Sequence, residues 1–427
     1  MVVGVGLSRK GNMELFVGID WGASMHSVCV LDETGNRLWE AEVPHTGDAV
    51  HHFAERIVAL AGGDPQCIRA SMEAPHGVMV EALIDRGVGA YFINPKQLDR
   101  FRDRHSVSGA KDDALDAFVL ADSLRTDLHL YRRIRLPEPE LLRLRSLSRR
   151  YEALTRQVVA LGNQISEELR RYFPQMEKLG RWHEEAWLWD LFAQAATPSV
   201  AQKLRLQKIE KVLKTHRIRR WKPTELKAQL TQTPLPVAPG VAEAASESIE
   251  LNLPVLRALR LQRETTAKRM KGLLEQLSEE TDDPEKKHHD AAIIQSLPGI
   301  GTKNGAVMLT EASAALQLRD ATAFRNLAGT RPVSRRTGGR KKKATVIMRK
   351  AKNTRLGQAV HHWAQSASRY DNRAQTHYQS LRSRGCSHGR ALRGVADRLI
   401  ALMFSMLREG KLYDSERWNN PSCPCPV

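Results

Sequence analysis

The chain has 427 residues, of which 41% are hydrophobic and 27% are charged, and its formal net charge at pH 7 is +18. This length allows two or three domains that each bury a core, and no apolar run approaches the roughly 20 residues of a spanning helix, which excludes an integral membrane protein. A positive excess of this size attracts a polyanion, most often nucleic acid, with a membrane surface as the weaker alternative.

Residues 1–13 lack the long apolar centre of a secretory signal, so we expect them to form a disordered leader. The five cysteines show no paired CxxC spacing, which indicates a reduced cytosolic protein without a disulfide framework or a zinc ribbon. We therefore expect a cytoplasmic, nucleoid-associated protein. The Pro-rich residues 413–427 are expected to form a disordered tail.

The region that follows the leader has the pattern of an α/β domain. Two apolar runs, a turn reading DETGN and an alternating segment predict three antiparallel strands, and helices and strands then alternate. The last predicted element is an acidic helix that reads GAKDDALDAFVLAD. The predicted strands are 14–22, 25–31, 37–43, 67–73 and 90–93, and the predicted helices are 48–61, 78–86 and 109–122.

Four acids stand at the ends of these elements. Asp20 ends the first strand and Glu73 ends the fourth, whereas Asp113 and Asp116 are three residues apart and share one face of the acidic helix. Each acid alone is ordinarily a cap or a favourable charge at a helix start. Together they could converge as an oxygen-rich site for Mg²⁺ or Mn²⁺, and two such ions roughly 4 Å apart could clamp a phosphodiester.

After Pro137 and Pro139, the pattern of alternating strands and helices gives way to a long helical pattern, which predicts a helical stalk. Apolar residues follow three-four spacing over 140–173, which is typical of a coiled-coil or bundle seam, and Pro174 is expected to end that helix. A second long helix over 254–278 could return against it. The seam allows dimers or tetramers, but one long amphipathic helix without self-association remains an alternative.

The final third begins with LPGIGTKNGAVML, residues 297–309. A Gly-Ile-Gly turn before an apolar helix resembles a helix-hairpin-helix element, in which backbone N–H groups near Gly299 and Gly301 could hold a DNA phosphate. A plain tight turn between helices is the alternative. The remaining residues, 356–411, are predicted to be helical.

Residues 321–370 contain thirteen Lys or Arg and no Asp or Glu. Solvated basic faces normally carry some acids, so this asymmetry indicates contact with a nucleic-acid backbone. Within it, the basic residues expected to contact phosphate are Arg335, Arg336, Arg340, Lys341, Lys342 and Lys343.

The stretches VGIDWGASMHSV, SMEAPHG and GAKDDALDAFVLAD resemble the RuvC-like domain of the DEDD transposases of the insertion sequence 110 family. This resemblance implies a ribonuclease H-like fold, places the four catalytic acids at Asp20, Glu73, Asp113 and Asp116, and matches Lys111 to the Lys of the family's KxDxxDA pattern. The chain departs from the family at Asp112, where a small hydroxyl residue is more usual. We interpret Asp112 as a helix cap.

The segment LAGTRPVSRRTGGRKKKATVIMRKAKN resembles the second half of the same family, in which a serine just before Gly in a basic loop acts as the nucleophile. Alignment of the glycines and of Pro332 puts Thr337 at that position, and Ser334 is the alternative if the loop register differs. A threonine hydroxyl can attack phosphorus, although its β-methyl adds crowding. A third possibility is a copy that has lost strand exchange.

The sequence thus predicts an α/β plus all-α protein. A ribonuclease H-like (RuvC-like) domain would occupy 14–136, a helical coiled-coil stalk 137–290, and a helical C-terminal DNA-binding domain 291–412. The resemblance implies a DNA transposase or recombinase that uses Mg²⁺ (or Mn²⁺), forms a covalent phosphoester through its hydroxyl, and pairs with an element-encoded bridge RNA.

Two other functions fit the same residues. A RuvC-like junction endonuclease would use the four acids with water as the nucleophile and would need neither Thr337 nor Ser334. A nucleic-acid-binding scaffold with an inactive metal site would need only the basic surface.

Overall fold

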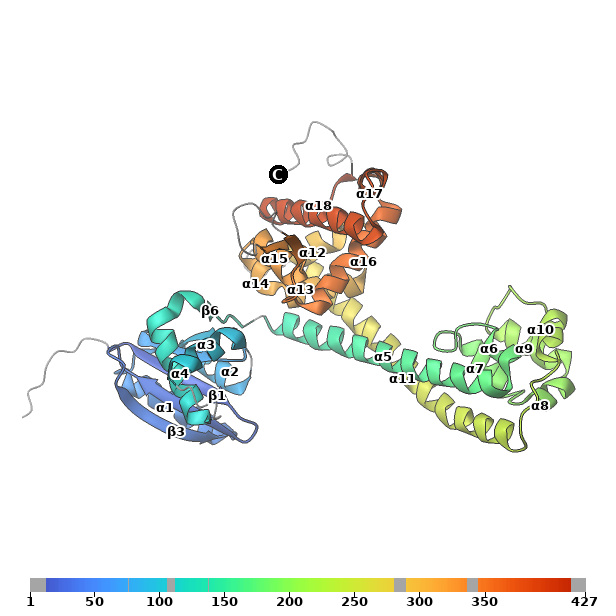
Figure 1. The fold of residues 1–427 in the computed structure, drawn as a ribbon, viewed down its shortest axis with the longest axis horizontal. Coiled ribbons are helices and arrows are strands. Elements are labelled where there is room, and N and C mark those ends of the chain that lie inside the picture. Colours follow the sequence, from blue (N-terminus) through green and yellow to red (C-terminus); the bar gives the residue numbers. More distant parts are fainter. Residues whose placement is uncertain are drawn as a thin grey trace, which may run out of the picture. The chain divides into compact units, whose positions relative to one another are not determined.

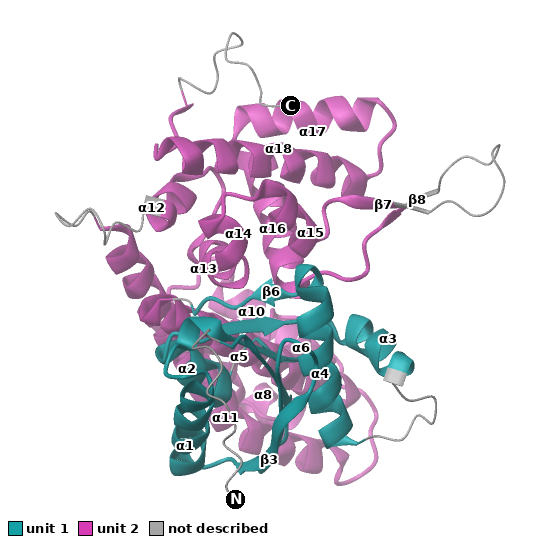
Figure 2. Ribbon diagram, turned by 90° about the vertical axis from the view of Figure 1, so that its left-hand side faces the viewer, with its two compact units in different colours: residues 1–137 teal, residues 138–427 magenta. Residues whose placement is uncertain are grey.

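A computed structural model describes residues 13–75, 77–105, 112–136, 138–279, 289–335 and 345–415. The chain divides into two units, residues 1–137 and 138–427, which Figure 2 distinguishes by colour. In the part of the chain that the structure describes, no helix combines the length and apolar character needed to cross a membrane.

The first unit is built on a mixed six-stranded sheet with the strand order β3-β2-β1-β4-β5-β6. Strands β1, β2 and β3 form an antiparallel meander, β4 and β5 continue parallel to β1, and β6 pairs antiparallel with β5. The strand bounds are β1 (Leu15–Trp21), β2 (Met25–Leu31), β3 (Arg37–Pro44), β4 (Ile68–Met72), β5 (Gly89–Phe92) and β6 (Arg132–Arg133).

Alternation along β1 gives the sheet two different apolar faces. Val17 and Ile19 share a core with helices α1 (Gly47–Leu60) and α2 (Val78–Asp85). Phe16 faces the other side, where it packs with residues of α4 (Asp113–Asp127). The sheet is therefore covered by helices on both faces (Figure 1).

The predicted strands and the first two helices of this unit lie within two residues of the observed ones. The acidic helix was placed too early, because it begins at Asp113, after Asp112, whose side chain accepts a hydrogen bond from the N–H of Ala114 at 3.1 Å. Asp112 is thus a helix cap, as expected. Four elements of this unit were not predicted from the sequence: α3 (Pro95–His105), β6 and the short 3-10 turns η1 (Pro65–Cys67) and η2 (Leu128–Leu130).

Two long helices, α5 (Pro139–Tyr172) and α11 (Val241–Ser278), run through the second unit. They are antiparallel, since Leu144 near the start of α5 shares a core with the end of α11, whereas Ile165 near the end of α5 packs with the start of α11. The prediction that α11 begins near Pro254 was wrong. Pro254 lies inside the helix at an exposed position, where the hydrogen bond that it cannot donate is lost on the solvent side.

At one end of this pair, residues 174–240 form a small group of helices around three buried tryptophans, Trp182, Trp187 and Trp189. We call residues 174–240 the helical tip. Pro174 ends α5 as predicted and also begins the next helix, where its missing N–H costs nothing. The helices of the tip are α6 (Pro174–Glu177), α7 (Ala186–Phe192), α8 (Pro198–Lys203), α9 (Leu206–Thr215) and α10 (Pro223–Leu230).

At the other end of the pair, a second helical core surrounds Trp363, Phe324 and Phe404. The predicted helical region from 356 onward is observed as three separate helices. The helices of this part are α12 (His289–Ser296), α13 (Thr302–Glu311), α14 (Ser313–Gln317), α15 (Ala321–Ala328), α16 (Thr354–Tyr370), α17 (Asn372–Ser383) and α18 (His388–Glu409).

Between α15 and α16 the basic segment contains a two-stranded antiparallel ribbon, β7 (Pro332–Arg335) and β8 (Thr345–Met348). This ribbon was expected to be part of a loop. Ser334 and Arg335 lie on β7, where they pair with Val346 and Thr345 of β8.

Candidate metal centre

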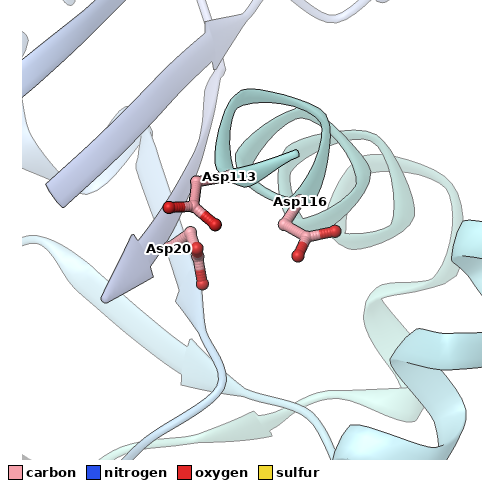
Figure 3. Close-up of side chains that lie close together, drawn as sticks. All are labelled: Asp20, Asp113 and Asp116. Carbon is pink, nitrogen blue, oxygen red and sulfur yellow. The ribbon is translucent and has the colours of Figure 1, made fainter. Parts of the chain in front are cut away.

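Three carboxylates of the first unit converge at one point. Asp20, Asp113 and Asp116 each offer one oxygen, and these oxygens lie within 4.8 Å of one another (Figure 3). Asp20 is half-buried, Asp113 is exposed, and Asp116 is only 3% exposed. A donor set made only of carboxylate oxygens at such distances fits a hard divalent cation.

Gly18 explains why β1 and α4 approach closely enough for this convergence. A Cβ at Gly18 would lie 1.9 Å from the carbonyl oxygen of Ala117, so α4 rests directly on the strand. Asp20 lies two residues further along β1 and therefore on the same face. Asp113 precedes Ala117 by one helical turn, which places it above that strand end.

Strand β4 brings the fourth predicted acid to the same edge of the sheet. Ser71 pairs with Gly18 in parallel register, and its hydroxyl donates to the carbonyl of Leu120 in α4 at 2.9 Å. Glu73 follows Ser71 by two residues, as Asp20 follows Gly18, so both acids leave their strands on the α4 side at the same end. Glu73 is not part of the group of three within 4.8 Å.

Arg102 of α3 connects Glu73 with that group. Its Nε donates to Asp116 Oδ1 at 2.5 Å, a second nitrogen donates to Asp99 at 3.0 Å, and a third lies 4.0 Å from Glu73 Oε1. The hydrogen bond that Arg102 donates to Asp116 and the surrounding negative charge raise the pKa of Arg102 above its ordinary value. The guanidinium therefore stays charged and balances the buried Asp116.

Sequence analysis did not identify Arg102, because α3 itself was not predicted. Its helix is strongly charged, and among residues 95–104 only Leu98 and Phe101 are buried in the core beneath it. The three-residue spacing of Asp99 and Arg102 was the signal that could have indicated a helix there.

In the second unit, the Gly-Ile-Gly turn joins α12 to α13. Gly299 has φ +76°, and a Cβ there would lie 2.6 Å from the backbone nitrogen of Ala367. The indole Nε1 of Trp363 donates to the carbonyl of Pro298 at 3.0 Å, which holds the turn against α16. Gly301 caps α13 and is exposed, with open space where a Cβ would be.

The predicted basic contacts and the two candidate nucleophiles lie partly outside the described residues. Ser334 and Arg335 lie on β7 by their backbone. The other predicted residues of this group lie outside the described residues: Lys111, Arg336, Thr337, Arg340, Lys341, Lys342 and Lys343.

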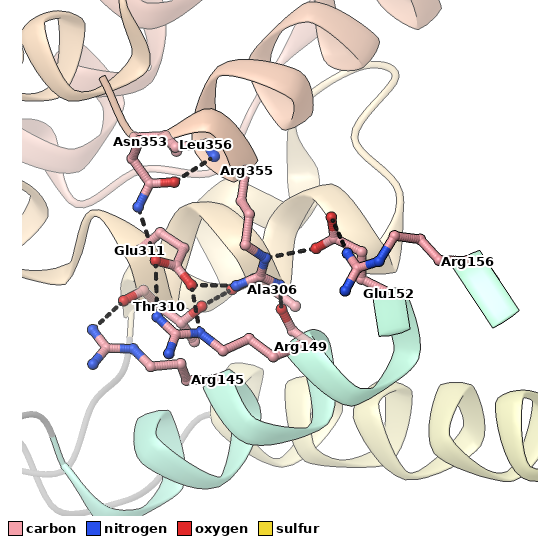
Figure 4. Close-up of polar contacts among 11 residues, drawn as sticks. Arg145, Arg149, Glu152, Arg156, Ala306, Thr310, Glu311, Asn353, Arg355 and Leu356 are labelled. Atoms are coloured by element: carbon pink, nitrogen blue, oxygen red, sulfur yellow. Dashed lines mark hydrogen bonds and ion pairs between the residues drawn. The ribbon is translucent and has the colours of Figure 1, made fainter. Parts of the chain in front are cut away.

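A polar network that was not predicted from the sequence connects α5, α13 and the start of α16 (Figure 4). Its centre is Glu311 of α13, which is 5% exposed and accepts hydrogen bonds from Arg149, Arg355 and Asn353. Arg355 also pairs with Glu152 at 2.6 Å. The network thus ties α5, α13 and the start of α16 together.

Glu311 stays ionised within this network. Burial alone would raise its pKa, but hydrogen bonds from Arg149 and Asn353 and the charges of Arg149 and Arg355 lower that pKa below its ordinary value. Asn353 accepts a hydrogen bond from the N–H of Leu356 as the cap of α16, and it follows β8 by five residues. The network therefore holds the short segment between the end of β8 and the start of α16.

Two family models match the chain at its two ends. A DEDD model named for IS110 and described as a transposase matches residues 17–174. A model described as a transposase of the IS116/IS110/IS902 family matches residues 291–379. The first match contains the converging carboxylates, and the second contains the Gly-Ile-Gly turn and the basic segment.

Comparison with individual proteins also gives matches to proteins of insertion elements. The chain is 28% identical over 418 residues to the mini-circle protein of IS117 from Streptomyces coelicolor, whose name describes it as a candidate transposase, and the match covers 96% of this chain and 97% of that protein. It is 24% identical over 412 residues to the 43.6 kDa protein of insertion element IS110 from the same organism, covering 94% and 96%. A match to y4uE of Sinorhizobium fredii, also named as a candidate transposase, reaches 40% identity but spans only 48% of this chain and 58% of that protein.

Proposed function

The chain belongs to the IS110 family of transposases, and from that premise we propose that it moves an insertion sequence by cutting and rejoining DNA strands. The family implies DNA as a partner and a divalent metal as a cofactor. The observation that carries the proposal is the convergence of Asp20, Asp113 and Asp116 on a mixed sheet that is compatible with a ribonuclease H-like fold.

We assign Mg²⁺, or Mn²⁺, to Asp20, Asp113 and Asp116, with Glu73 as the fourth catalytic acid. Such an ion would stabilise charge on the reacting phosphodiester. Arg102 keeps Asp116 oriented and offsets part of the negative charge of the four acids. Lys111 would contact DNA phosphate beside them.

The attacking hydroxyl in this proposal belongs to Thr337, with Ser334 as the alternative. Attack on phosphorus would form a phosphoester with the chain and release a DNA hydroxyl, and a second transesterification would rejoin the strands without ATP. Phosphate contacts would come from the Gly299–Gly301 turn and from the basic segment, namely Arg335, Arg336, Arg340, Lys341, Lys342 and Lys343.

The remaining elements of the proposal concern organisation and partners. Residues 14–136 would carry the metal site, 137–290 would form a coiled-coil stalk, and 291–412 would carry the nucleophile. We further propose an element-encoded bridge RNA as the guide, a homodimer or homotetramer as the active form, and a place in the cytoplasm on the nucleoid. Base pairing by the RNA would then supply sequence specificity.

A covalent-trapping experiment tests this mechanism. The purified chain, its co-purifying RNA, labelled donor DNA and Mg²⁺ are incubated, and any protein–DNA adduct is isolated on a denaturing gel and mapped. We expect an adduct on Thr337 or Ser334 that Asp20→Asn abolishes. Metal-dependent cleavage without an adduct, retained when both hydroxyl residues are replaced by Ala, would instead support the water-using endonuclease. Absence of cleavage and adduct would support the inactive scaffold.

A further inference from the structure

The helical tip carries a charge distribution that neither the metal site nor the basic segment explains. Residues 174–240 contain twelve Lys or Arg and six Asp or Glu. All six acids pair with basic residues. The pairs are Glu177–Arg170, Glu184–Arg181, Glu185–Arg220, Asp190–Arg257, Glu210–Lys214 and Glu225–Lys222.

One further basic residue of the tip forms hydrogen bonds within the tip itself. The ammonium group of Lys227 donates to the backbone carbonyls of Ala201, Gln202 and Leu204 at 2.6–2.8 Å, where it caps the end of α8. These pairings leave the excess positive charge on a different set of side chains.

Apart from Lys178, this set consists of six exposed residues around α9, which we call the distal basic surface. None of them forms an ion pair with any carboxylate in the described ranges of the chain. They are Lys203, Arg205, Lys208, Lys211, Arg217 and Arg219.

The fold of the tip directs these charges outward. Ile209 and Leu213 bury one side of α9 in the tryptophan core, so Lys208 and Lys211 project away from it. Lys203 and Arg205 precede the helix, and Arg217 and Arg219 follow it. Helix α9 has ten residues and so extends about 15 Å, and a duplex lying along it would present about nine phosphate charges over that length.

The aromatic side chains of the tip decide which nucleic acid suits this surface. Unpaired bases in RNA or single-stranded DNA are typically held by stacking on exposed aromatic rings. Trp182, Trp187, Trp189 and Phe192 are buried, and Trp221 is only partly exposed. Charge without a stacking platform favours the continuous backbone of a duplex.

We propose that the distal basic surface binds the phosphate backbone of duplex DNA without reading its sequence. The tip core and the C-terminal core lie at opposite ends of α5 and α11 (Figure 1), about 30 Å apart along α5 between Leu144 and Ile165. The surface therefore holds DNA that flanks the region contacted by the C-terminal part. This inference rests on the family's use of DNA, but it does not depend on the metal chemistry.

The test compares two double variants of the full chain that remove the same charge. Lys208→Gln with Lys211→Gln removes two unpaired charges, and the matched control, Lys214→Gln with Lys222→Gln, removes two paired ones. Binding to a labelled duplex of arbitrary sequence is measured by fluorescence anisotropy in EDTA, at several salt concentrations. Thermal unfolding checks that both variants are folded.

We expect the first variant to bind duplex DNA about tenfold more weakly, with a salt slope about 1.8 smaller, because each lost phosphate contact removes about 0.9 from that slope. The control should change affinity by less than about threefold. Equal losses in both variants, or no loss in the first, would overturn the proposal, as would a selective loss of affinity for single-stranded RNA. A wild-type chain that binds no duplex would overturn it together with the DNA partner, whereas loss of cleavage alone would bear only on the proposed mechanism.

Discussion

Arg102 and a divalent cation interact with the same carboxylates. The guanidinium touches Asp116 and lies 4.0 Å from Glu73, so it lowers the negative potential that would attract a metal. We therefore expect Arg102→Gln to tighten Mn²⁺ binding about tenfold, which corresponds to roughly 1.4 kcal/mol for the loss of one nearby charge. Titration of free Mn²⁺ by electron paramagnetic resonance measures this directly.

Arg104→Gln is the matched control, because Arg104 lies on the same helix, is 62% exposed and lies 3.9 Å from Asp127. It should leave Mn²⁺ affinity nearly unchanged. Weaker binding in Arg102→Gln would show that orienting Asp116 outweighs the repulsion between the guanidinium and the metal.

Gly18 is the second residue on which the metal site depends. A methyl group there would push α4, which carries Asp113 and Asp116, away from β1. We expect Gly18→Ala to lower the free energy of unfolding by about 1–3 kcal/mol and to weaken Mn²⁺ binding as well. Urea denaturation and the same Mn²⁺ titration measure the two effects.

Gly47→Ala provides the comparison, since no atom lies within 4 Å of the position that its Cβ would take. Its stability and metal affinity should match those of the unaltered chain. A Gly18→Ala variant that behaves in the same way would show that α4 does not need this close contact.

At the scale of elements, the polar network around Glu311 is expected to stabilise the C-terminal part. Glu311→Gln would remove a carboxylate whose side chain is only 5% exposed and which Arg149 and Arg355 share. Arg355, whose side chain is 20% exposed, would lose one of its two carboxylate partners, whereas Arg149 is 56% exposed. We expect this substitution to lower the free energy of unfolding by about 3 kcal/mol at pH 7. Urea unfolding followed by tryptophan fluorescence measures this change. Glu225→Gln, which breaks the exposed pair with Lys222, should cost less than about 1 kcal/mol.

The difference in the free energy of unfolding between the wild-type chain and Glu311→Gln should depend on pH, because the pKa of Glu311 is lowered in the folded state. A carboxyl whose pKa is lower in the folded state adds stability above its unfolded pKa of about 4.3, and that stability is lost as the pH falls through the folded value. The difference in the free energy of unfolding between the wild-type chain and Glu311→Gln should therefore reach its full size at pH 7 and become smaller below about pH 4. A gap that stays constant down to pH 3 would contradict this assignment.

Patterns of apolar residues predicted the elements that bury much of their length. Strand β1 and helix α1 follow such patterns and were placed within two residues. Among residues 95–104 of helix α3, only Leu98 and Phe101 are buried, and the β7–β8 ribbon lies in a basic segment with few apolar residues. Neither element therefore shows the regular spacing of apolar residues from which a helix or strand is predicted. The convergence of Asp20 with Asp113 and Asp116 could be predicted because a charge is unusual at the end of an apolar strand, whereas the position of Arg102 depends on a contact between two helices.

At the scale of the whole molecule, the proposed acids and hydroxyl lie in different units of the chain. An oligomer could then combine acids from one subunit with the hydroxyl of another. We expect an equal mixture of Asp20→Asn and the double variant Thr337→Ala with Ser334→Ala to recover about a quarter of wild-type adduct formation, because half of the dimers would be mixed and each would hold one intact site. Adduct formation on labelled donor DNA measures the recovery, and no recovery would assign both groups to one subunit.

The two family models match residues 17–174 and 291–379, so the segment between them contains all of α11 and all of the helical tip except Pro174. The sequence placed the tip inside the expected helical stalk but did not predict its tryptophan core, because short helices joined by turns leave no long period. Its charge asymmetry became interpretable only when the structure showed which acids are paired.

The antiparallel course of α5 and α11 means that the chain enters and leaves the helical tip at neighbouring points. Such an insertion is modular: natural or engineered chains could lengthen, shorten or exchange it without rerouting the rest of the polypeptide. Removing seven residues from each helix would draw the tip inward by about 10 Å and turn it by only about 20°. The helix pair would then act as an adjustable spacer, whose length sets the distance between the helical tip and the C-terminal core.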